Sequence, residues 1–389
     1  MKKRITMILL IVLCLALIGL GLGLVCCNGA GDPHEDSTPE TTESTEAAAG
    51  QVCILNMDPN LQSAYAALAA EYFDLTGTEV RVISSVDEGA PTLRTVTGAS
   101  QLPQACADLS QTAACGQLVS QDLTLRDETG RVCAVAAEVE VFGLVYNSTL
   151  LAKTSNTRSD IQGFSALTEV VYGITDRKAS LGFSAFARVD PDDRFALQLA
   201  SLSADARNLV DLILNNTTCD PLMLEQSSQS DALQEFLDAK AVFFLAGSRE
   251  QEILQAIGSE NMGVLPVYTG GGNEENQSLC AAARSYWCVD GSAAEQDVAA
   301  TLAFLDFLIH PRADGSVPVD DLQRMSPYRQ TTYVSNMLES VFRSDLAMGK
   351  EPVVCRYVSR VPQGMTEALI AYAENPSDEN WDAVVAFMG

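Results

Sequence analysis

The chain has 389 residues, of which 47% are hydrophobic and 19% charged, so it can bury a sizeable core in two or three compact units or in one large two-lobed unit. Acidic residues outnumber basic ones 51 to 24, and the formal charge of -27 excludes binding of nucleic-acid phosphates. Only two histidines occur, His34 and His310, which argues against mechanisms that need a histidine base or a multi-histidine metal site.

The N-terminus reads as an export signal. Basic residues at positions 2–4 precede an apolar run over residues 5–25, an order typical of secretory signals. The run ends in LVCC, which resembles a bacterial lipobox, so residues 1–26 are the predicted lipoprotein signal peptide and Cys27 is the predicted lipid attachment residue. Cleavage before Cys26 stays open, as does an uncleaved anchor, because about 20 apolar residues span a bilayer. Both readings place the body outside the cell, tethered to the outer face of the cytoplasmic membrane.

Residues 27–50 are predicted to be a disordered acidic tether. After Cys27 this segment holds six acidic residues, no basic residue and no large apolar side chain. Such a composition cannot bury enough surface to offset the entropy of ordering, and its like charges extend the chain. We therefore expect the tether to hold the following domain away from the membrane.

From residue 51 the pattern alternates between strands and helices. Residues 51–57 form a compact apolar strand, and residues 61–72 carry apolar side chains at helical spacing before Gly77 ends the helix. Residues 79–84 then alternate as a second strand. The unit predicts two parallel strands joined by a right-handed crossover, which indicates an α/β fold.

The alternation continues to the C-terminus. Further strands are predicted over residues 140–147, 241–246, 263–267 and 286–289, and further helices over residues 231–239, 298–309, 366–374 and 380–388. No repeat of 20–50 residues is visible in the sequence, which argues against solenoids and propellers.

Eight cysteines follow Cys27, and an even number outside the cell invites disulfides. Four of them lie in short apolar runs, where a thiol is a small core residue: Cys53, Cys133, Cys288 and Cys355. Buried free thiols are therefore the favoured interpretation, while the pairs nearest in sequence, Cys106 with Cys115 and Cys280 with Cys288, leave disulfides open. No CxxC motif and no zinc-type spacing occurs, so we predict neither a metal site nor a cofactor.

Several segments, in order, carry a resemblance to a known family. The lipobox and tether are followed by AEYFDLTGTEVRVIS, SQLPQACADLSQTAACGQLVSQDLT, EVEVFGLVYNSTLLAKT, LQEFLDAKAVFFLAGSREQEIL, MGVLPVY, YWCVDGSAAEQDVAATLAFLDFLI, MSPYRQ, GKEPVVCRYVSRVPQG and ENWDAVVAFM. In this order and spacing they resemble an extracellular solute-binding lipoprotein of a bacterial ABC importer, of the carbohydrate-binding group. The resemblance covers nearly the whole body of the chain.

The resemblance implies a two-lobed α/β fold of the periplasmic-binding-protein type, a clamshell with hinge crossings and a ligand cleft between its lobes. Residues 51–148 and 268–335 would form lobe I, and residues 149–267 and 336–389 would form lobe II. It also implies a monomer that captures a mono- or oligosaccharide without catalysis and delivers it to an ABC permease. Such a binder needs rigid lobes, a hinge and a polar cleft, and the scarcity of histidine agrees with this.

Polar residues directly after strands are the first cleft candidates, because open α/β sheets present ligands at the carboxyl ends of their strands. Asp58 and Asn60 follow the first strand, and Ser248 and Arg249 follow the strand over residues 241–246. Helix capping would also explain Asp58 and Asn60. A surface ion pair would also explain Arg249.

Aromatic residues are the second group, because a sugar ring offers an apolar face on which they stack. Trp287 is the leading candidate and Tyr286 lies beside it, although a core position would explain Trp287 as well. The resemblance adds Glu140 and Phe142 from EVEVFGLVY, a strand whose packing on both faces would explain the phenylalanine, and Tyr328 after the proline of MSPYRQ.

Two departures from the family bear on the ligand. The family commonly has an aromatic residue where Arg249 stands and a tyrosine where Phe142 stands. An arginine suits an acidic or phosphorylated group, so the neutrality of the sugar stays open.

Two alternatives to an importer subunit remain. The first is a surface-anchored glycan-acting hydrolase. Its catalytic carboxylate pair would depend on the three-dimensional distance between two acidic side chains and not on their spacing in the sequence, and the 51 acidic residues could supply such a pair. The second is a binding protein that serves a sensor, which would share every feature of the cleft.

Overall fold

The computed structural model describes residues 50–188, 199, 206–217, 229–247, 255–268, 279–347, 353–354 and 364–388. The predicted signal peptide, Cys27 and the predicted tether up to residue 49 lie outside the described residues, as do Ser248, Arg249 and Cys355. Among the residues described, none of the helices combines the length and the hydropathy that crossing a bilayer requires.

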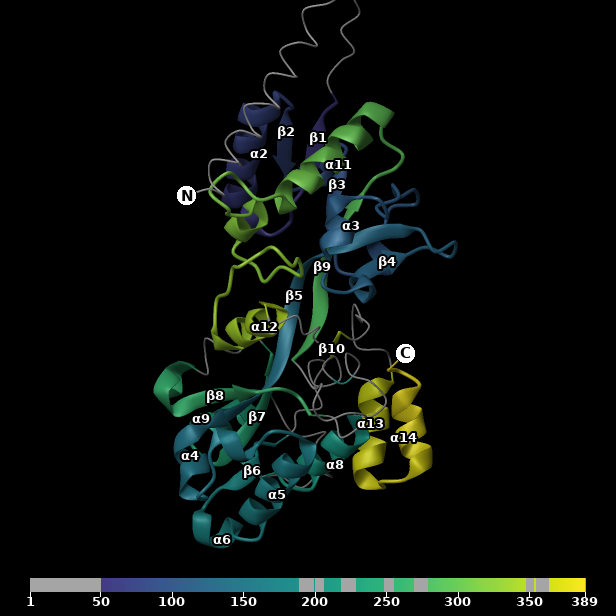
Figure 1. Cartoon of the computed structure of the whole chain (residues 1–389). Coiled ribbons are helices and arrows are strands. Elements are labelled where there is room, and N and C mark those ends of the chain that lie inside the picture. Colours follow the sequence, from purple (N-terminus) through teal and green to yellow (C-terminus); the bar gives the residue numbers. More distant parts are fainter. Residues whose placement is uncertain are drawn as a thin grey trace, which may run out of the picture. The chain divides into compact units, whose positions relative to one another are not determined.

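The first elements confirm the predicted β-α-β unit. β1 (Val52–Leu55) pairs in parallel with β2 (Val80–Ile83), and between them lie the 3-10 turn η1 (Pro59–Leu61) and helix α2 (Gln62–Thr76) (Figure 1). Gly77 ends α2 in the left-handed region with φ of 73°, a conformation that glycine adopts without steric cost.

One mixed sheet contains the described strands. Its order is β2-β1-β3-β9-β5-β7-β6, with β10 on β9 and with β4 and β8 on β5. Neighbours of β9 and β5 within this path are antiparallel, whereas β2, β1 and β3 are parallel, as are β6 and β7. The remaining strands are β3 (Leu93–Val96), β4 (Thr124–Arg126), β5 (Val132–Asn147), β6 (Ser184–Phe186), β7 (Ala241–Gly247), β8 (Met262–Leu265), β9 (Cys280–Val289) and β10 (Val353–Val354).

Strands β5 and β9 are longer than their sequence predicts. β5 pairs with β9 from Ala134 to Phe142, and its last residues pair with β7 and β8. In Figure 1 the two strands run from the elements around β1 and β3 to those around β7 and β8. β5 therefore joins both parts of the sheet, and because it is buried along nearly its whole length, polar–apolar alternation does not mark its full extent in the sequence.

The helices cover the sheet, and the predicted helices near residues 231–239, 298–309, 366–374 and 380–388 are confirmed as α9, α11, α13 and α14. The α-helices after α2 are α3 (Ala113–Gln117), α4 (Ser148–Lys153), α5 (Phe164–Thr175), α6 (Lys178–Leu181), α8 (Arg207–Leu214), α9 (Gln229–Leu237), α11 (Glu295–Ile309), α12 (Met337–Ala347), α13 (Met365–Glu374) and α14 (Asp378–Val385). The other 3-10 turns are η2 (Val86–Glu88), η3 (Ala99–Gln101), η4 (Gln121–Leu123), η5 (Arg158–Asp160), η9 (Gln255–Ile257), η10 (Ser259–Asn261) and η12 (Pro318–Leu322).

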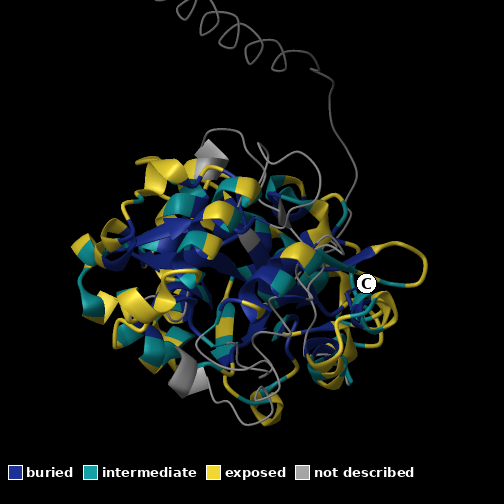
Figure 2. Ribbon diagram, turned by 90° about the horizontal axis from the view of Figure 1, so that it is seen from below, coloured by how far each residue is buried: buried dark blue, intermediate teal, exposed yellow. Residues whose placement is uncertain are grey.

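Two large hydrophobic clusters hold these layers together. One contains buried residues of β1, β3, α2 and α11, and the other contains buried residues of β6, β7, α5, α8, α13 and α14. β5 supplies Val139 and Val141 to the first cluster and Phe142 and Leu144 to the second. Figure 2 shows the buried residues concentrated in the strands, with exposed residues on the helices and loops around them.

The cysteines in apolar runs agree with their predicted burial where the structure describes them. Cys53, Cys133 and Cys288 are buried, with exposed fractions of 9%, 4% and 0%. Trp381 of α14 is 6% exposed and lies in the second cluster.

Candidate functional site

A cavity of about 740 Å³ is bordered by the middle of β5 and β9. Its volume lies within the range of about 300–1,000 Å³ that is typical of small-molecule sites. Its walls come from segments far apart in the sequence: Asp58, Asn60, Leu61, Ser63 and Ala64; Glu138 and Val139; Arg284; Asp321, Leu322, Gln323, Arg324 and Met325; and Tyr333, Ser335 and Glu339.

A register shift in β5 lies at the floor of this cavity. Ala136 pairs with Tyr286 and Val139 with Ala283, and the pairing is irregular on both sides of Glu138. Such an irregularity bends a strand and re-aims a side chain. The shift therefore helps Glu138 to line the cavity although it belongs to a buried strand.

The turn after β1 brings Asp58 and Asn60 to the cavity, as predicted from their position after a strand. The buried Asn56 side chain donates a hydrogen bond from Nδ2 to the Asp58 carbonyl oxygen at 2.8 Å. Asp58 Oδ1 accepts from the Asn60 backbone N–H at 2.9 Å, and Oδ2 accepts from Arg324 Nη2 at 3.0 Å. The Asn60 N–H and the Arg324 guanidinium hold the pKa of Asp58 below its ordinary value. Asp58 is thus both the cap of η1 and a cavity residue.

Arg284 is the second cation of the cavity, and β5 carboxylates hold it. Its Nη1 donates to Glu140 Oε2 at 2.8 Å, and its Nε lies 4.0 Å from Glu138 Oε1. Glu140 is 5% exposed and is not part of the cavity wall. In this structure its carboxylate supports Arg284, and a direct contact of Glu140 with a ligand stays a prediction.

The ring of Trp287, the predicted stacking platform, lies in the core of this structure, and its contact with a sugar stays a prediction. Trp287 is 1% exposed, its Nε1 donates to the Tyr65 hydroxyl at 3.1 Å, and it stacks on Tyr328 with ring centres 6.2 Å apart. Tyr328 in turn donates its hydroxyl to the Ala136 carbonyl at 2.8 Å. Protein groups thus take the places that a sugar ring was expected to fill.

Tyr286 and Phe142 are also buried in this structure, and their contact with a sugar stays a prediction. Tyr286 is 0% exposed in the first cluster and Phe142 is 3% exposed in the second. Neither residue lines the cavity. Both residues belong to strands that are covered on both faces, so side chains that point to either face of the sheet are buried.

Tyr333 is the aromatic side chain that sequence reasoning missed. It is half-buried and is the one aromatic residue among the described lining residues. It lies five residues beyond Tyr328, in an irregular segment without strand or helix periodicity. Arg284 could have been identified from the sequence, because it is the charged residue within the largely apolar strand CAAARSYWCV.

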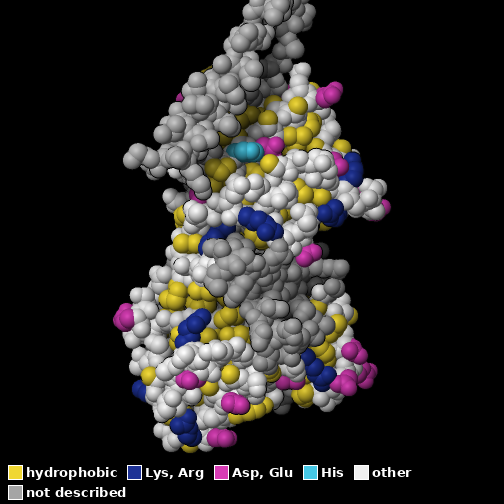
Figure 3. Space-filling view, viewed as in Figure 1, with side chains coloured by type: hydrophobic (Ala, Val, Ile, Leu, Met, Phe, Trp, Pro, Cys, Tyr) yellow, Lys and Arg dark blue, Asp and Glu magenta, His cyan; other side chains and the backbone are white. Residues whose placement is uncertain are grey.

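The charge of the cavity wall is negative. Four carboxylates line it, from Asp58, Glu138, Asp321 and Glu339, against the two guanidiniums of Arg284 and Arg324, a formal balance of -2. Both guanidiniums already contact carboxylates. On the face shown in Figure 3, acidic and basic side chains lie interspersed and do not gather into a basic patch.

Gln323 lines the cavity with a backbone in the left-handed region, at φ of 52°. Its N–H donates to the Asp320 carbonyl at 3.0 Å and so closes η12. A residue with a β-carbon pays about 1 kcal/mol for this conformation. We expect Gln323→Gly to raise the free energy of unfolding by about 0.5–1 kcal/mol in urea titrations.

Gln296, on α11, provides the matched control for that substitution. It is exposed and helical, so Gln296→Gly should lower the free energy of unfolding by up to about 1 kcal/mol. Equal losses for both variants would show that position 323 is not strained.

Protein-family models give no match to the chain, and no curated protein sequence matches it. Solved structures do match. A family 1 extracellular solute-binding protein from Bifidobacterium longum subsp. infantis has a TM-score of 0.63 at 14% identity, covering 87% of this chain and 98% of its own. RafE from Streptococcus pneumoniae has a TM-score of 0.62 at 10% identity, covering 88% and 98%.

A third match is an extracellular solute-binding protein from Staphylococcus aureus in complex with maltose, with a TM-score of 0.60 at 14% identity, covering 87% of this chain and 96% of that one. Identities in this range show the fold. The mixed α/β chain therefore has the fold of these solute-binding proteins, as its sequence predicts.

Proposed function

We propose that this protein is a solute-binding protein of an ABC importer, which captures a carbohydrate in the cavity beside β5 and β9 and passes it on unchanged. The observation that carries the proposal is the cavity wall. It presents carboxylates, guanidiniums, amides and hydroxyls that can bind sugar hydroxyls, together with one half-buried tyrosine ring. A sugar is a ligand that needs both kinds of surface.

The structural matches support a saccharide. The Staphylococcus aureus structure contains maltose, RafE has been solved in complex with raffinose, and the solute receptor AcbH, with a TM-score of 0.62, prefers galactopyranose. The same fold thus accepts mono- and oligosaccharides in those proteins.

The charge balance of the described wall favours a neutral sugar over an acidic one. Arg284 and Arg324 are the wall's cations, and each already contacts a carboxylate. An acidic ligand would have to displace those contacts or meet the wall's net negative charge. The described part of the wall therefore favours a mono- or oligosaccharide without a carboxylate or phosphate group.

We propose that the chain reaches its site of action through its N-terminus. The basic residues, apolar run and LVCC sequence support export, lipid attachment at Cys27, and a location on the outer face of the cytoplasmic membrane. We also propose a division into lobe I (51–148 and 268–335) and lobe II (149–267 and 336–389), with β5 leading from one hydrophobic cluster into the other. A membrane permease would then receive the solute.

The test is a ligand panel on the full chain, purified in detergent and followed by its melting temperature. A bound saccharide at 100 times its dissociation constant should add about 2.7 kcal/mol to the free energy of unfolding. Neutral sugars should raise the melting temperature, whereas uronic acids and sugar phosphates should not. The sugar should be recovered intact after prolonged incubation.

Site variants connect the result to this cavity. Asp58→Asn and Tyr333→Ala should weaken the stabilisation by a neutral sugar, because both residues line the cavity. Glu367→Gln, an exposed change on α13, should leave it unchanged. If peptides or polyamines raise the melting temperature and no saccharide does, the substrate class is wrong, and if the sugar is cleaved, the chain is a hydrolase.

A further inference from the structure

Three cysteines that are distant in sequence converge where β5 begins and β9 ends. Cys133 is the second residue of β5, and its neighbour Ala134 pairs with Cys288 of β9. Cys106 forms a β-bridge with Asp290, the residue that follows β9. The fold therefore gathers thiols from positions 106, 133 and 288 at one corner of the sheet.

Backbone hydrogen bonds fix the segment that carries Cys106 against both strands. The N–H of Ala107 donates to the Val289 carbonyl at 3.0 Å, and the N–H of Leu109 donates to the Val132 carbonyl at 2.8 Å. Gly291 permits this approach, because a β-carbon there would lie 2.9 Å from the carbonyl carbon of Cys106. Cys106 is thus held in place beside the start of β5.

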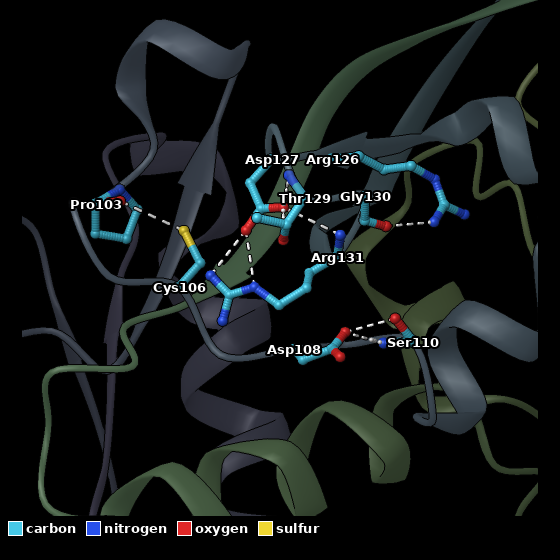
Figure 4. A network of polar contacts seen from close by, with 9 residues as sticks. All are labelled: Pro103, Cys106, Asp108, Ser110, Arg126, Asp127, Thr129, Gly130 and Arg131. Atoms are coloured by element: carbon cyan, nitrogen blue, oxygen red, sulfur yellow. Dashed lines mark hydrogen bonds and ion pairs between the residues drawn. The ribbon is translucent and has the colours of Figure 1, made fainter.

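The Cys133 thiol raises the pKa of Cys106, which agrees with the two side chains lying close together at this corner, and both cysteines are free thiols in this structure. The Cys106 thiol donates to the Pro103 carbonyl oxygen at 3.4 Å, and Figure 4 shows it near the Arg131 side chain. Cys106 is half-buried, whereas Cys133 and Cys288 are 4% and 0% exposed. Cys106 is therefore the member of the cluster that a soluble oxidant can reach.

We propose that Cys106 and Cys133 form a disulfide in the exported protein, tying the 103–109 segment to β5. Exported proteins meet an oxidising environment in which such bonds persist. Cys288, which is 0% exposed, remains a thiol in this proposal.

The bond forms by thiol–disulfide exchange with an external disulfide, such as that of a thiol oxidase or of oxidised glutathione. The Cys106 thiolate attacks one sulfur of that disulfide, and one thiolate leaves. The Cys133 thiolate then attacks the mixed disulfide at the Cys106 sulfur and expels the second thiolate. Two protein thiols lose two protons and two electrons, and one external disulfide is reduced to two thiols.

The surroundings of Cys106 make the uncatalysed exchange slow at neutral pH. Burial, the Cys133 thiol and the Asp290 carboxylate raise the pKa of Cys106 to about 11, against the opposing effect of Arg131. The thiolate is the reacting form, so exchange should accelerate as the pH rises toward that value.

The experiment isolates the full chain from cells that export it, in the presence of an alkylating agent, and maps its peptides by mass spectrometry without reduction. A second sample is reduced, then incubated with oxidised glutathione at pH 9 before mapping. We expect a cross-linked pair of peptides containing Cys106 and Cys133, lighter by two hydrogen atoms than the two thiol forms. Reduction should lower the melting temperature by several degrees.

Cys115→Ser serves as the matched control, because Cys115 is buried outside the cluster and the cross-link should persist in this variant. Cys106→Ser should abolish both the cross-link and the effect of reduction on the melting temperature, and because the residue is half-buried the variant should still fold. Alkylation of both thiols in both samples, or a cross-link that joins Cys288 to either of them, would overturn the proposal.

Discussion

Trp287→Ala is expected to lower the free energy of unfolding by about 3–5 kcal/mol, the usual cost of truncating a buried tryptophan. The indole is 1% exposed, stacks on Tyr328 and donates to the Tyr65 hydroxyl at 3.1 Å. Its removal leaves a cavity and takes a hydrogen-bond partner from a tyrosine with a buried hydroxyl. Urea titrations of the full chain, followed by circular dichroism, measure the loss.

Tyr333→Ala is the comparison that separates packing from binding. Tyr333 is half-buried in the cavity wall, so its truncation should change the free energy of unfolding by less than about 1 kcal/mol. It should weaken saccharide binding about 2- to 12-fold, since ring stacking is worth about 0.5–1.5 kcal/mol. A Trp287→Ala variant with unchanged stability and lost binding would return Trp287 to the site and contradict the packing seen here.

Arg284→Met is expected to cost about 3–5 kcal/mol, because it removes the guanidinium that neutralises a buried carboxylate. Glu140 is 5% exposed, and its Oε2 accepts from Arg284 Nη1 at 2.8 Å. Without the cation, Glu140 loses the ion pair with Arg284 in a poorly solvated position. Urea titrations at neutral pH give the difference in the free energy of unfolding.

Two further variants make this result specific. Arg324→Met removes the other cavity cation, whose partner Asp58 has a side chain 38% exposed, and should cost less than about 1 kcal/mol. The double variant Arg284→Met with Glu140→Leu should recover part of the stability, since the buried carboxylate is removed together with the guanidinium that pairs with it. A small loss in Arg284→Met alone, equal to that of Arg324→Met, would show that Glu140 does not depend on this ion pair.

The sequence could predict what local periodicity controls. The apolar stripe of α2, the strand before it and Gly77 after it predict the β-α-β opening, and the structure confirms it. The turn after β1 follows from the same pattern, which is why Asp58 and Asn60 could be assigned to the cavity.

Features that depend on tertiary packing could not be predicted. Successive side chains of β9 point to opposite faces of the sheet, and both faces are covered. The sequence therefore could not show whether Trp287 and Tyr286 are core residues or stack on a ligand. The irregular register around Glu138 depends on how β5 pairs with β9, and the sequence of neither strand by itself predicts it. The hydrogen bond between Asp58 and Arg324 joins residues that are 266 positions apart, and no local sequence pattern predicts it.

The walls of the cavity come from both ends of the folded region, with Asp58 near its start and Glu339 near its finish. A chain that extends only as far as β9 lacks the part of the cavity wall that residues 321–339 supply. The proposed site is therefore complete only when nearly the whole folded region is present. A C-terminal truncation before position 320 is accordingly expected to abolish the stabilisation by sugar that the proposed function predicts.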